Sequence, residues 1–453
     1  MQYSIVNFKK AIESSYSKRI DPEFFYPEYL INDNKIKKHN YSCLSNFIQV
    51  ITGGATPLGA EYNDGVIPFL RVQNIMENYI DTSDVVYISK EDDNLLSRSR
   101  LKKYDVLLTI TGAYGKSSVV LDEQVNSNIN QHSVKMEIIN INPFYLSTFF
   151  NTRHGYMQST KNIVGITRPA LDYSSIRNFF IPIFSDEFQK SIEKLVLEAH
   201  NQRQKSNSLM KEANEILEKE IGFDKLEIKK KKVNYSIVNY RETLSSKRID
   251  AEYYQEKYKI IMDKIQSYKN GCIKITDLNS INNKLISIDK NKKYEYIELS
   301  NIDSMGFINN LELYYGYELP SRARRLLNNN DVIISSVEGS LDKSSLIYNN
   351  NDNLLCSTGF LVFNENEFIN PETLFCFFRL ALIKELLKKI SKGTILTAFD
   401  SNAICDMEIP NLDKNVQNVI AEKVQDAYKA RDKAKALLEE AKKKVEDAIE
   451  NGE

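Results

Sequence analysis

The chain has 453 residues, 42% of them hydrophobic and 27% charged, which is typical of a folded protein with two or three domains. Its formal net charge of −1 excludes a histone-like polyanion binder, although a balanced total is compatible with a local basic groove. No run approaches the roughly 18 apolar residues of a membrane span, and residues 1–10 lack the apolar core of a signal peptide. We therefore expect a cytoplasmic protein. The five cysteines lie far apart without a CxxC pair, which favours free thiols over zinc or disulfides.

The first part of the chain alternates short strand patterns with helix patterns. Runs rich in β-branched residues and bounded by Gly, Asn or Asp predict strands at 85–88, 105–110 and 117–121. The pair Asn142-Pro143 then opens a helix pattern that extends to Arg153, because proline is favoured at the start of a helix. We interpret these elements as an α+β globule and place it at residues 1–184.

A long amphipathic helix is predicted next, at residues 185–222. Its apolar positions recur in alternating steps of three and four, which is the heptad spacing of a coiled coil. The seam runs through Ile192, Leu195, Ala199, Gln202, Ser206, Leu209, Ala213 and Ile216. The lysine-rich segment 225–232 follows, and it reads as a solvated linker, with a phosphate-binding tail as the alternative.

The second half of the chain repeats the first. The sequence YSIVN at residues 3–7 returns at 235–239, and KRID at residues 18–21 returns at 247–250. Three further segments match in the same order, which are 69–75 with 296–302, 105–108 with 331–334, and 165–182 with 393–410. Five matches in one order predict two homologous halves. We therefore expect a second globule at 223–411, in which a helix pattern from Glu372 to Lys388 follows Asn370-Pro371.

A second long helix is predicted at residues 412–453. Nine Lys or Arg and ten Asp or Glu cover its outer faces, while one apolar seam needs a partner. That seam runs through Ile420, Val424, Ala427, Arg431, Ala434, Leu438, Ala441, Val445 and Ala448. We predict that the two long helices pair antiparallel, with Gln202 and Ser206 near Arg431, where polar groups would fix the register. In the alternative, each polar residue points off the seam.

Before the first long helix, the first half carries an ordered set of motifs. They are Gly53 to Pro57, Arg71 to Ile75, the segment 101–112, Asn130-Gln131-His132, Gly165 to Pro169, and Ile181-Pro182 before the first long helix. The second half has looser counterparts at 319–323 and at Ile409-Pro410. This duplicated order of motifs and helices resembles the specificity subunits of type I restriction-modification systems, over essentially the whole chain.

The resemblance implies that each globule is a target-recognition domain that reads one half of a bipartite, asymmetric site in double-stranded DNA. The paired helices would separate the half-sites and hold two modification subunits, which carry adenine-N6 methyltransferase activity with S-adenosylmethionine as their cofactor. The chain itself would be a non-catalytic subunit without cofactor or metal, serving phage defence through DNA methylation. Whether restriction subunits join the complex stays open. Half-sites one helical turn apart are about 34 Å apart, and helices of this length extend roughly 50 Å.

The second half departs from the family pattern at two places. The counterpart of Thr167-Arg168-Pro169-Ala170 is Ile395-Leu396-Thr397-Ala398, and the Asn-Gln-His triplet is missing. Cys356-Ser357-Thr358-Gly359 stands roughly where that triplet would be. These departures concern the base-reading surface of the second globule and leave its predicted fold unchanged.

The sequence offers no convincing catalytic motif. The run from Gly112 to Ser117 lacks the first glycine of a phosphate-binding loop, because that position is Ile110. Asn142-Pro143-Phe144 lacks the second proline of an adenine methyltransferase motif, so a helix start accounts for it better. The four histidines have neither metal-ligand spacing nor a triad pattern.

Residues that contact DNA are predicted by residue type and position. Basic clusters before the strands at 105 and 331 suit phosphate contacts, with solvated turns as the alternative. These clusters are Arg98, Arg100, Lys102 and Lys103 in the first half and Arg322, Arg324 and Arg325 in the second. Loop residues able to read base edges are Thr111, Tyr114, Lys116, Gln131 and Arg168, followed by Ser335, Ser336, Lys343, Ser357 and Lys392.

Two rival functions stay open at this point. The chain could be an enzyme with an unrecognised site, or a coiled-coil scaffold protein whose globules bind protein. The scaffold hypothesis predicts no salt-dependent DNA binding, whereas the DNA-recognition hypothesis predicts an affinity that falls steeply with salt.

Overall fold

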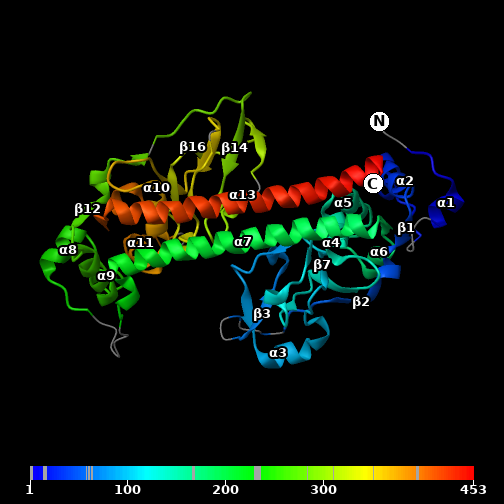
Figure 1. The fold of residues 1–453 in the computed structure, drawn as a ribbon. Coiled ribbons are helices and arrows are strands. Elements are labelled where there is room, and N and C mark those ends of the chain that lie inside the picture. Colours follow the sequence, from blue (N-terminus) through cyan, green and yellow to red (C-terminus); the bar gives the residue numbers. More distant parts are fainter. Residues whose placement is uncertain are drawn as a thin grey trace. The chain divides into compact units, whose positions relative to one another are not determined.

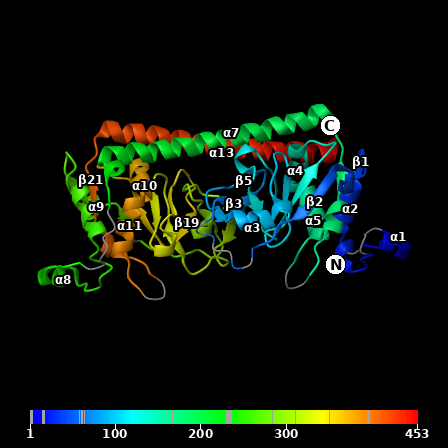
Figure 2. The same ribbon diagram turned by 90° about the horizontal axis from the view of Figure 1, so that it is seen from below.

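The structure is a computed structural model of residues 1–453 (Figures 1 and 2). It describes residues 4–13, 18–57, 59, 62, 65–165, 169–228, 236–282, 284–309, 311–349, 351–393 and 397–452. The chain forms two compact units: unit 1 contains residues 1–203 and 431–453, and unit 2 contains residues 204–430. Each unit mixes helices with small sheets, as the predicted α+β class requires. No helix of the described residues is long and apolar enough to cross a bilayer.

Unit 1 is built on an antiparallel sheet with the strand order β2-β10-β7-β8. Its strands are β2 (Ile48–Gly53), β7 (Val106–Thr109), β8 (Ser117–Val119) and β10 (Ser133–Ile138). A second sheet has the order β6-β3-β9, from β3 (Ile67–Leu70), β6 (Val86–Ile88) and β9 (Asn128–Ile129). Two further pairs join β1 (Tyr41–Cys43) to β11 (Phe180–Pro182), and β4 (Ile75–Met76) to β5 (Tyr79–Ile80). The predicted strands at 85–88, 105–110 and 117–121 are therefore confirmed.

The helices of unit 1 differ in position, and α4 is the one that packs most closely on the β2-β10-β7-β8 sheet. They are α1 (Phe8–Glu13), α2 (Pro27–Ile36), α3 (Lys90–Leu95), α4 (Pro143–Asn151), α5 (Arg153–Lys161), α6 (Tyr173–Arg177) and the start of α7 (Asp186–Ile221). Phe144 and Phe149 of α4 are buried between the sheet and the long helices, in one cluster with Val106 and Ile192. Asn142 caps α4, because its side-chain oxygen accepts from the peptide N–H groups of Phe144 and Tyr145.

Unit 2 has an antiparallel sheet with the order β13-β20-β17-β18. Its strands are β13 (Ile281–Asn282), β17 (Val332–Ser335), β18 (Ser344–Leu346) and β20 (Phe360–Phe363). The second sheet, β15-β14-β19-β16, consists of β14 (Lys293–Ile297), β15 (Leu313–Tyr315), β16 (Ala323–Leu326) and β19 (Leu354–Ser357). A last pair joins β12 (Cys272–Lys274) to β21 (Glu408–Pro410). This order repeats that of unit 1, apart from the additional strand β16 and from the β4–β5 pair, in whose place the described residues of unit 2 have only the bridge between Ile302 and Ile308. It supports the predicted duplication.

The helices of unit 2 repeat those of unit 1 as well. They are α8 (Tyr240–Ser246), α9 (Glu256–Gln266), α10 (Pro371–Arg379), α11 (Ala381–Ile390), α12 (Ser401–Ile404) and the start of α13 (Lys414–Asn451). The helix predicted from 372 to 388 is in fact two helices that meet at Leu380. This residue has extended backbone angles, so the helix cannot continue through it. The first helix pattern divides in the same way at Thr152, between α4 and α5.

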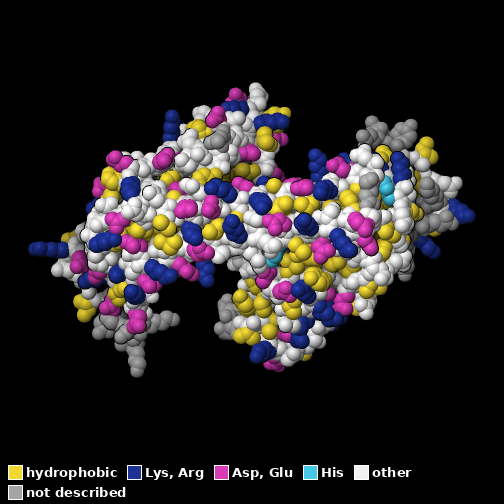
Figure 3. Space-filling view, in the orientation of Figure 1, with side chains coloured by type: hydrophobic (Ala, Val, Ile, Leu, Met, Phe, Trp, Pro, Cys, Tyr) yellow, Lys and Arg dark blue, Asp and Glu magenta, His cyan; other side chains and the backbone are white. Residues whose placement is uncertain are grey.

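The two long helices are antiparallel, as predicted. In unit 1 Lys433 of α13 pairs with Glu198 of α7 at 3.4 Å, and in unit 2 Lys423 pairs with Glu212 at 2.7 Å. Residue numbers therefore decrease along α13 in the direction in which they increase along α7. On the face seen in Figure 3, basic and acidic side chains alternate over α7 and α13, which matches the mixed charge of their exposed positions.

The predicted seam of α13 is correct at all nine positions, which are at most 9% exposed, including Arg431 at 8%. On α7 the prediction is correct for Ile192, Ala199, Ser206 and Ala213, and its other positions are displaced by one residue. The buried residues there are Val196, Met210 and Leu217 instead of Leu195, Leu209 and Ile216. Both neighbours are apolar in each pair, so the periodicity alone does not decide between them.

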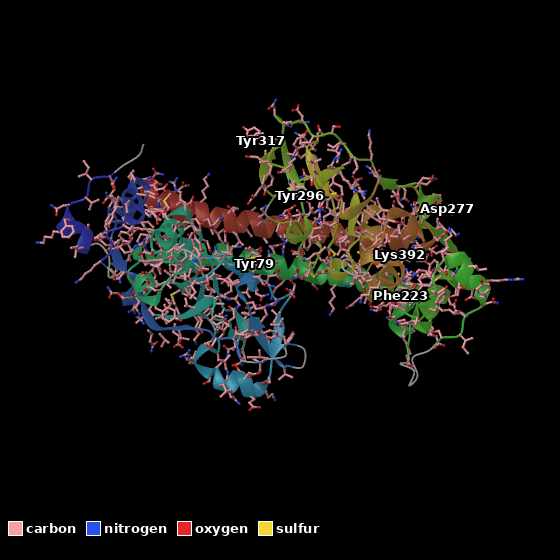
Figure 4. All side chains as sticks on the ribbon, turned by 180° about the vertical axis from the view of Figure 1, so that it is seen from behind. Tyr79, Phe223, Asp277, Tyr296, Tyr317 and Lys392 are labelled. Carbon is pink, nitrogen blue, oxygen red and sulfur yellow. The ribbon has the colours of Figure 1, made fainter. Side chains whose placement is uncertain are left out.

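The polar positions of the α7 seam also differ from the prediction. Gln202 is displaced from the seam, and its neighbour Arg203 places its guanidinium 3.5 Å from the centre of the Tyr79 ring (Figure 4). Ser206 stays in the seam, fully buried, and its hydroxyl donates to the carbonyl of Ala427 at 2.7 Å. The alternative that the polar groups point away is thereby excluded for Ser206.

A buried glutamine fixes each long helix to its own unit. The side-chain oxygen of Gln189 accepts from the peptide N–H of Asn142 at 2.9 Å, and its amide donates to the carbonyl of Phe184 at 3.0 Å. Gln417 of α13 accepts from Asn370 at 2.9 Å and donates to Leu412 at 2.9 Å. A satisfied buried amide needs one geometry, so these bonds set the angle at which each helix leaves its unit.

Candidate nucleic-acid interface

Four loops of unit 1 meet at one end of the β2-β10-β7-β8 sheet, and we call them the first loop cluster. Their described residues are 54–57, 110–116, 130–132, 164–165 and 169–170. The peptide N–H of Ile110 donates to the carbonyl of His132 at 2.9 Å, and that of Leu171 donates to Ile110 at 3.0 Å. Val164 and Ala170 pair across the base of the last loop. The fold thus brings together motifs that are separated by more than a hundred residues in the sequence.

Polar side chains tie these loops to one another. The hydroxyl of Thr111 lies 2.7 Å from Nδ1 of His132, and the hydroxyl of Thr56 donates to the side-chain oxygen of Gln131. Gly54 allows the close approach, because a Cβ at this position would lie 2.0 Å from the carbonyl oxygen of Ile129. The first loop cluster is therefore a defined surface rather than a set of independent loops.

Unit 2 contains a second loop cluster with the same backbone frame, whose described residues are 335–343, 357–359, 392–393 and 397–398. The peptide N–H of Ser336 donates to the carbonyl of Gly359 at 2.9 Å, and that of Phe399 donates to Ser336 at 3.0 Å. Lys392 and Ala398 pair across the base of the last loop. Residues 357–359 occupy the place of the Asn-Gln-His triplet, as the sequence predicted.

The structure places the predicted base-reading residues of the first half on or beside this cluster. Gln131 is exposed, while Thr111, Tyr114 and Lys116 are half-buried. The Tyr114 ring stacks on Tyr156 of α5, with 5.8 Å between the ring centroids and 2° between the planes. Arg168 lies outside the described residues.

The Tyr114–Tyr156 stack borders a groove of about 480 Å³ that sequence analysis missed. Lys116 lines it from the β7–β8 loop, and Arg153 and Tyr156 line it from α5. A basic and an aromatic residue three positions apart on one helix are the only local signal. Their proximity to the loop depends on how α5 packs on α4, which the periodicity does not specify.

The predicted residues of the second cluster divide into two groups. Ser335 is 1% exposed and Ser357 is 8% exposed, and their hydroxyls are bonded to Ser340 and to the N–H of Gly359 respectively. Both side chains stabilise the loops, so the prediction that they read bases is replaced by a structural role. Ser335 in particular ends a strand whose four residues are all buried. Ser336, Lys343 and Lys392 stay accessible.

These three accessible side chains are not equally free to contact DNA, because two of them already form hydrogen bonds within the unit. The hydroxyl of Ser336 donates to the carbonyl of Gly359 at 2.8 Å, and the Lys343 ammonium donates to the carbonyl of Ile302 at 2.8 Å. Lys392 is exposed and precedes the loop that is the counterpart of residues 165–169. Lys392 is thus the most available cation of the second loop cluster.

The first basic cluster is largely neutralised by carboxylates. Arg100 pairs with Asp93, Lys102 with Glu137 at 2.8 Å, and Lys103 with Asp122 at 2.8 Å. The bond from Lys102 lowers the pKa of Glu137, so this acid stays charged under neutral conditions. Arg98 is exposed and has no ion pair within the described residues. We therefore favour the solvated-turn alternative for Arg100, Lys102 and Lys103.

The second basic cluster differs from the first, because carboxylates among the described residues do not neutralise two of its three arginines. Arg322 and Arg324 are exposed at the start of β16, and neither has a carboxylate partner among the residues that the structure describes. The side chain of Arg324 makes one long bond, 3.4 Å, to the carbonyl of Ile286. Arg325 points inward and donates to the carbonyl of Asn282 at 3.0 Å. Arg322 and Arg324 are suited to phosphate contacts, whereas Arg325 supports the sheet.

The described residues provide no recognisable catalytic centre. Among them no three His, Cys, Asp or Glu side chains gather in a way that could hold a metal ion. Burial lowers the pKa of His154 to about 4 and raises the pKa of the Cys356 and Cys376 thiols to about 12. Residues 112–117 connect two strands rather than a strand and a helix, unlike a phosphate-binding loop.

Comparison with known proteins identifies one family. The description "Type I restriction modification DNA specificity domain" matches residues 36–219, which run from the end of α2 to near the end of α7 and include the first loop cluster. The type I restriction enzyme EcoBI specificity subunit of Escherichia coli is 31% identical over 148 residues. That alignment covers 32% of this chain and 30% of the relative's length.

Solved structures of similar proteins give weaker likenesses over more of the chain. The S subunit of a type I restriction-modification system from M. genitalium is 11% identical, covering 91% of this chain and 96% of its own, with a TM-score of 0.41. The HsdS subunit from Thermoanaerobacter tengcongensis is also 11% identical, covering 91% of this chain and 97% of its own, with a TM-score of 0.29.

Proposed function

We propose that the chain is the specificity subunit of a type I restriction-modification system and reads a bipartite, asymmetric DNA site, because residues 36–219 match the DNA specificity domain of such systems and part of the chain is similar to the EcoBI specificity subunit. Unit 1 reads one half-site through the first loop cluster, and unit 2 reads the other through the second. The observation that carries this proposal is the repeated backbone frame of the two clusters, which presents different side chains. Two readers with one frame and different surfaces suit two different half-sites.

We assign the contacts by what each side chain leaves free. Arg98, Arg322 and Arg324 contact phosphates, because they are exposed and have no ion pair within the described residues. Gln131 and Lys392 read base edges, with Thr111, Tyr114, Lys116, Ser336 and Lys343 at the border of the surface. Arg168 stays a candidate on its residue type alone. The neutralised first cluster predicts weak binding of DNA by the chain alone, with partner subunits supplying further phosphate contacts.

The long helices act as a spacer and as a dock in this proposal. At about 1.5 Å per residue, the 36 residues of α7 and the 38 of α13 extend roughly 54 and 57 Å. Half-sites one helical turn apart are about 34 Å apart, which helices of this length can span. Two modification subunits bind the chain and supply adenine-N6 methylation with S-adenosylmethionine, so the chain itself is a non-catalytic subunit of the cytoplasm. Restriction subunits complete the complex where the system encodes them.

The test is to map methylated adenines in the genome of cells with the complete system and of cells that lack only this gene. The proposal predicts that one gapped, asymmetric adenine motif disappears with the gene. An unchanged methylome from an expressed, active system would contradict it. If the purified chain then bound protein partners but no DNA at low salt, the scaffold alternative would be the better account.

A further inference from the structure

One loop of unit 2 carries four lysines that form no ion pair within the part of the chain that the structure describes. We call residues 284–293 the lysine loop, and its cations are Lys284, Lys290, Lys292 and Lys293. All four are exposed. The loop contains one acid, Asp289, whose side chain accepts from the peptide N–H of Asn291 at 3.0 Å. Four lysines and one aspartate give the loop a charge of +3.

The lysine loop is held against the second sheet of unit 2. Ile286 and Ile288 pack in one small core with Tyr294 of β14. The peptide N–H of Ile286 donates to the carbonyl of Arg324 at 2.9 Å, and that of Asp289 donates to the Tyr294 hydroxyl at 3.2 Å. The backbone that carries the lysines is therefore ordered before any partner arrives, so less conformational entropy is lost on binding.

Two exposed tyrosines extend this basic surface. The rings of Tyr315 and Tyr317 stack with 5.4 Å between their centroids and 10° between their planes, and the Lys293 ammonium lies 4.8 Å from the centre of the Tyr315 ring. The peptide N–H of Tyr317 donates to the carbonyl of Lys290 at 3.3 Å. Figure 4 shows Tyr317 at the end of the second sheet. Lysine ammonium groups and tyrosine hydroxyls both donate to phosphate oxygens.

The surface adjoins the second loop cluster. The peptide N–H of Thr358 donates to the carbonyl of Arg322 at 2.9 Å. Strand β14 runs from Lys293 to Ile297, and Ile297 pairs with the residue directly before 357–359. At about 3.3 Å per residue, the four steps along this strand extend roughly 13 Å. That distance corresponds to about four base pairs of duplex at roughly 3.4 Å each.

Unit 1 does not repeat this charge. The alignment of Phe69 with Tyr296 places residues 57–66 opposite the lysine loop. That segment contains no Lys or Arg and has two acids, Glu61 and Asp64, which give it a charge of −2. A loop that served only solubility would need neither an ordered backbone nor a position beside a DNA-reading surface. The difference in charge therefore indicates an anionic partner that unit 2 contacts and unit 1 does not.

We propose that the lysine loop, with Tyr315 and Tyr317, contacts the DNA backbone next to the half-site of unit 2, over about four base pairs. This inference rests on the proposed function and adds a phosphate-binding surface outside the second loop cluster. Unit 2 consequently contacts a longer stretch of duplex than unit 1 does. Phosphate contacts orient the DNA without reading its sequence, so the added contacts leave the half-site itself unchanged.

The experiment uses the complex of the chain with its modification subunits, bound to a long duplex that contains the methylated motif. Hydroxyl-radical footprinting of both strands shows which backbone positions are protected. Binding at several salt concentrations gives the slope of log K against log salt. The test variant replaces three lysines of the loop, as Lys290→Ala, Lys292→Ala and Lys293→Ala.

The matched control removes the same charge elsewhere in unit 2, as Lys225→Ala, Lys247→Ala and Lys259→Ala. These lysines are exposed as well, and none of them has an ion pair among the described residues. Lys247 follows α8 and Lys259 lies on α9, and both helices lie away from β14 in Figure 1. Thermal unfolding confirms that both variants fold, as expected for exposed positions.

We expect wild type and the control to protect roughly four more base pairs at one half-site than at the other. The test variant should lose only this extension, and its salt slope should fall by up to about 2.7, since each phosphate contact contributes about 0.9. Its methylation motif should stay the same. Tyr317→Ala should weaken binding about tenfold and leave the slope unchanged, because it removes a hydrogen bond to a phosphate but no charge.

Three results would overturn the inference. An unchanged footprint and slope in the test variant would show that the lysine loop is only a solvated surface. Equal losses in the control would show a general effect of charge. Loss of a modification subunit from the test variant, measured by native mass spectrometry, would identify the surface as a protein contact. A wild-type complex that protects no motif would instead refute the proposed function, before any variant is compared, and the inference with it.

Discussion

Units 1 and 2 each have a central strand that follows a buried aspartate, and the two aspartates have different surroundings. Asp105 and Asp331 both accept a peptide N–H three residues back, from Lys102 at 2.8 Å and from Asn328 at 2.7 Å. In unit 1 the aspartate then pairs with the buried Lys135 at 3.1 Å, whereas in unit 2 it accepts from the amide of Asn364 at 2.6 Å. The turn requires the aspartate, and its second partner is free to vary.

The same division runs through the loop clusters. Backbone bonds such as Ile110 to His132 and Ser336 to Gly359 are repeated, while the side chains on them differ. The basic residues before the central strand are paired with carboxylates in unit 1, but Arg322 and Arg324 keep their charge in unit 2. Duplication has preserved the frame, and the charge of each surface has changed independently. A substitution in one unit can therefore be compared with the matching substitution in the other.

The largest expected effect comes from breaking the buried pair of unit 1. Lys135 is 2% exposed, so Lys135→Ala leaves Asp105 charged and buried, at a cost of about 3–5 kcal/mol. Asn364→Ala in unit 2 leaves an acceptor with one remaining bond and should cost about 1–3 kcal/mol. Urea unfolding, followed by fluorescence and by proteolysis of each unit, measures both. Equal costs would contradict the distinction between an ionic and a neutral partner.

Replacing the unpaired arginines of unit 2 should weaken DNA binding more than replacing the paired lysines of unit 1. Arg322→Ala with Arg324→Ala should reduce the slope of log K against log salt by up to about 2, since each lost phosphate contact contributes about 0.9. Lys102→Ala with Lys103→Ala is the matched pair, and we expect little change because Glu137 and Asp122 already neutralise these lysines. Filter binding of the assembled complex at several salt concentrations is the measurement. The reverse order of effects would refute the assignment of phosphate contacts.

Exposed residues of the two clusters should change different half-sites. Gln131→Ala should relax the half-site read by unit 1, and Lys392→Ala the half-site read by unit 2, each by about 1–3 kcal/mol of discrimination. Methylation motifs mapped in cells that carry each variant show which half is affected. A variant that altered both halves, or neither while methylation persisted, would remove that residue from the reading surface.

Much of this frame could be predicted because its signals are local. The seam of α13 follows from spacing alone, the start of α4 follows from Asn142-Pro143, and the duplication follows from five matching segments in one order. The seam of α7 was harder to assign because apolar neighbours such as Leu209 and Met210 fit a heptad equally well. The meeting of the polar loops at one end of the sheet was not predicted, because periodicity does not show which loops lie together.

The electrostatics of the candidate site could not be predicted in the same way. Lys102 is neutralised by Glu137, which lies 35 positions away on β10, and no sequence pattern links the two. Ser335 was a candidate by residue type, and its burial follows from the sheet that forms around β17. Pairing across a sheet decides which charges stay free, so residue type alone overestimates the number of DNA contacts.

The smallest expected effect concerns pH and sharpens the comparison of the two aspartates. Burial raises the pKa of Asp331 above its ordinary value near 3.8, as it does for Asp105, so folding favours the protonated acid. The stability that each aspartate gives is therefore complete below the unfolded pKa and is lost as pH rises through the folded pKa. Asp331→Asn keeps the shape of the side chain and removes this loss. Its oxygen can accept from the peptide N–H of Asn328, and the Asn364 amide can turn over so that its oxygen accepts from the new NH2 group. Its free energy of unfolding should consequently gain on wild type as pH rises from 4 to 7.

Asp105→Asn is the matched control for this measurement. Asn at position 105 would face the Lys135 ammonium, which then keeps only the Arg100 carbonyl and Glu137 as partners, so this variant should gain less on wild type as pH rises than Asp331→Asn does. Unfolding in urea at several pH values between 4 and 7 compares the two. Parallel curves for wild type and Asp331→Asn would mean that the Asn364 amide stabilises the Asp331 carboxylate enough to offset its burial. The neutral partner of unit 2 would then serve the buried charge as well as the lysine of unit 1 does.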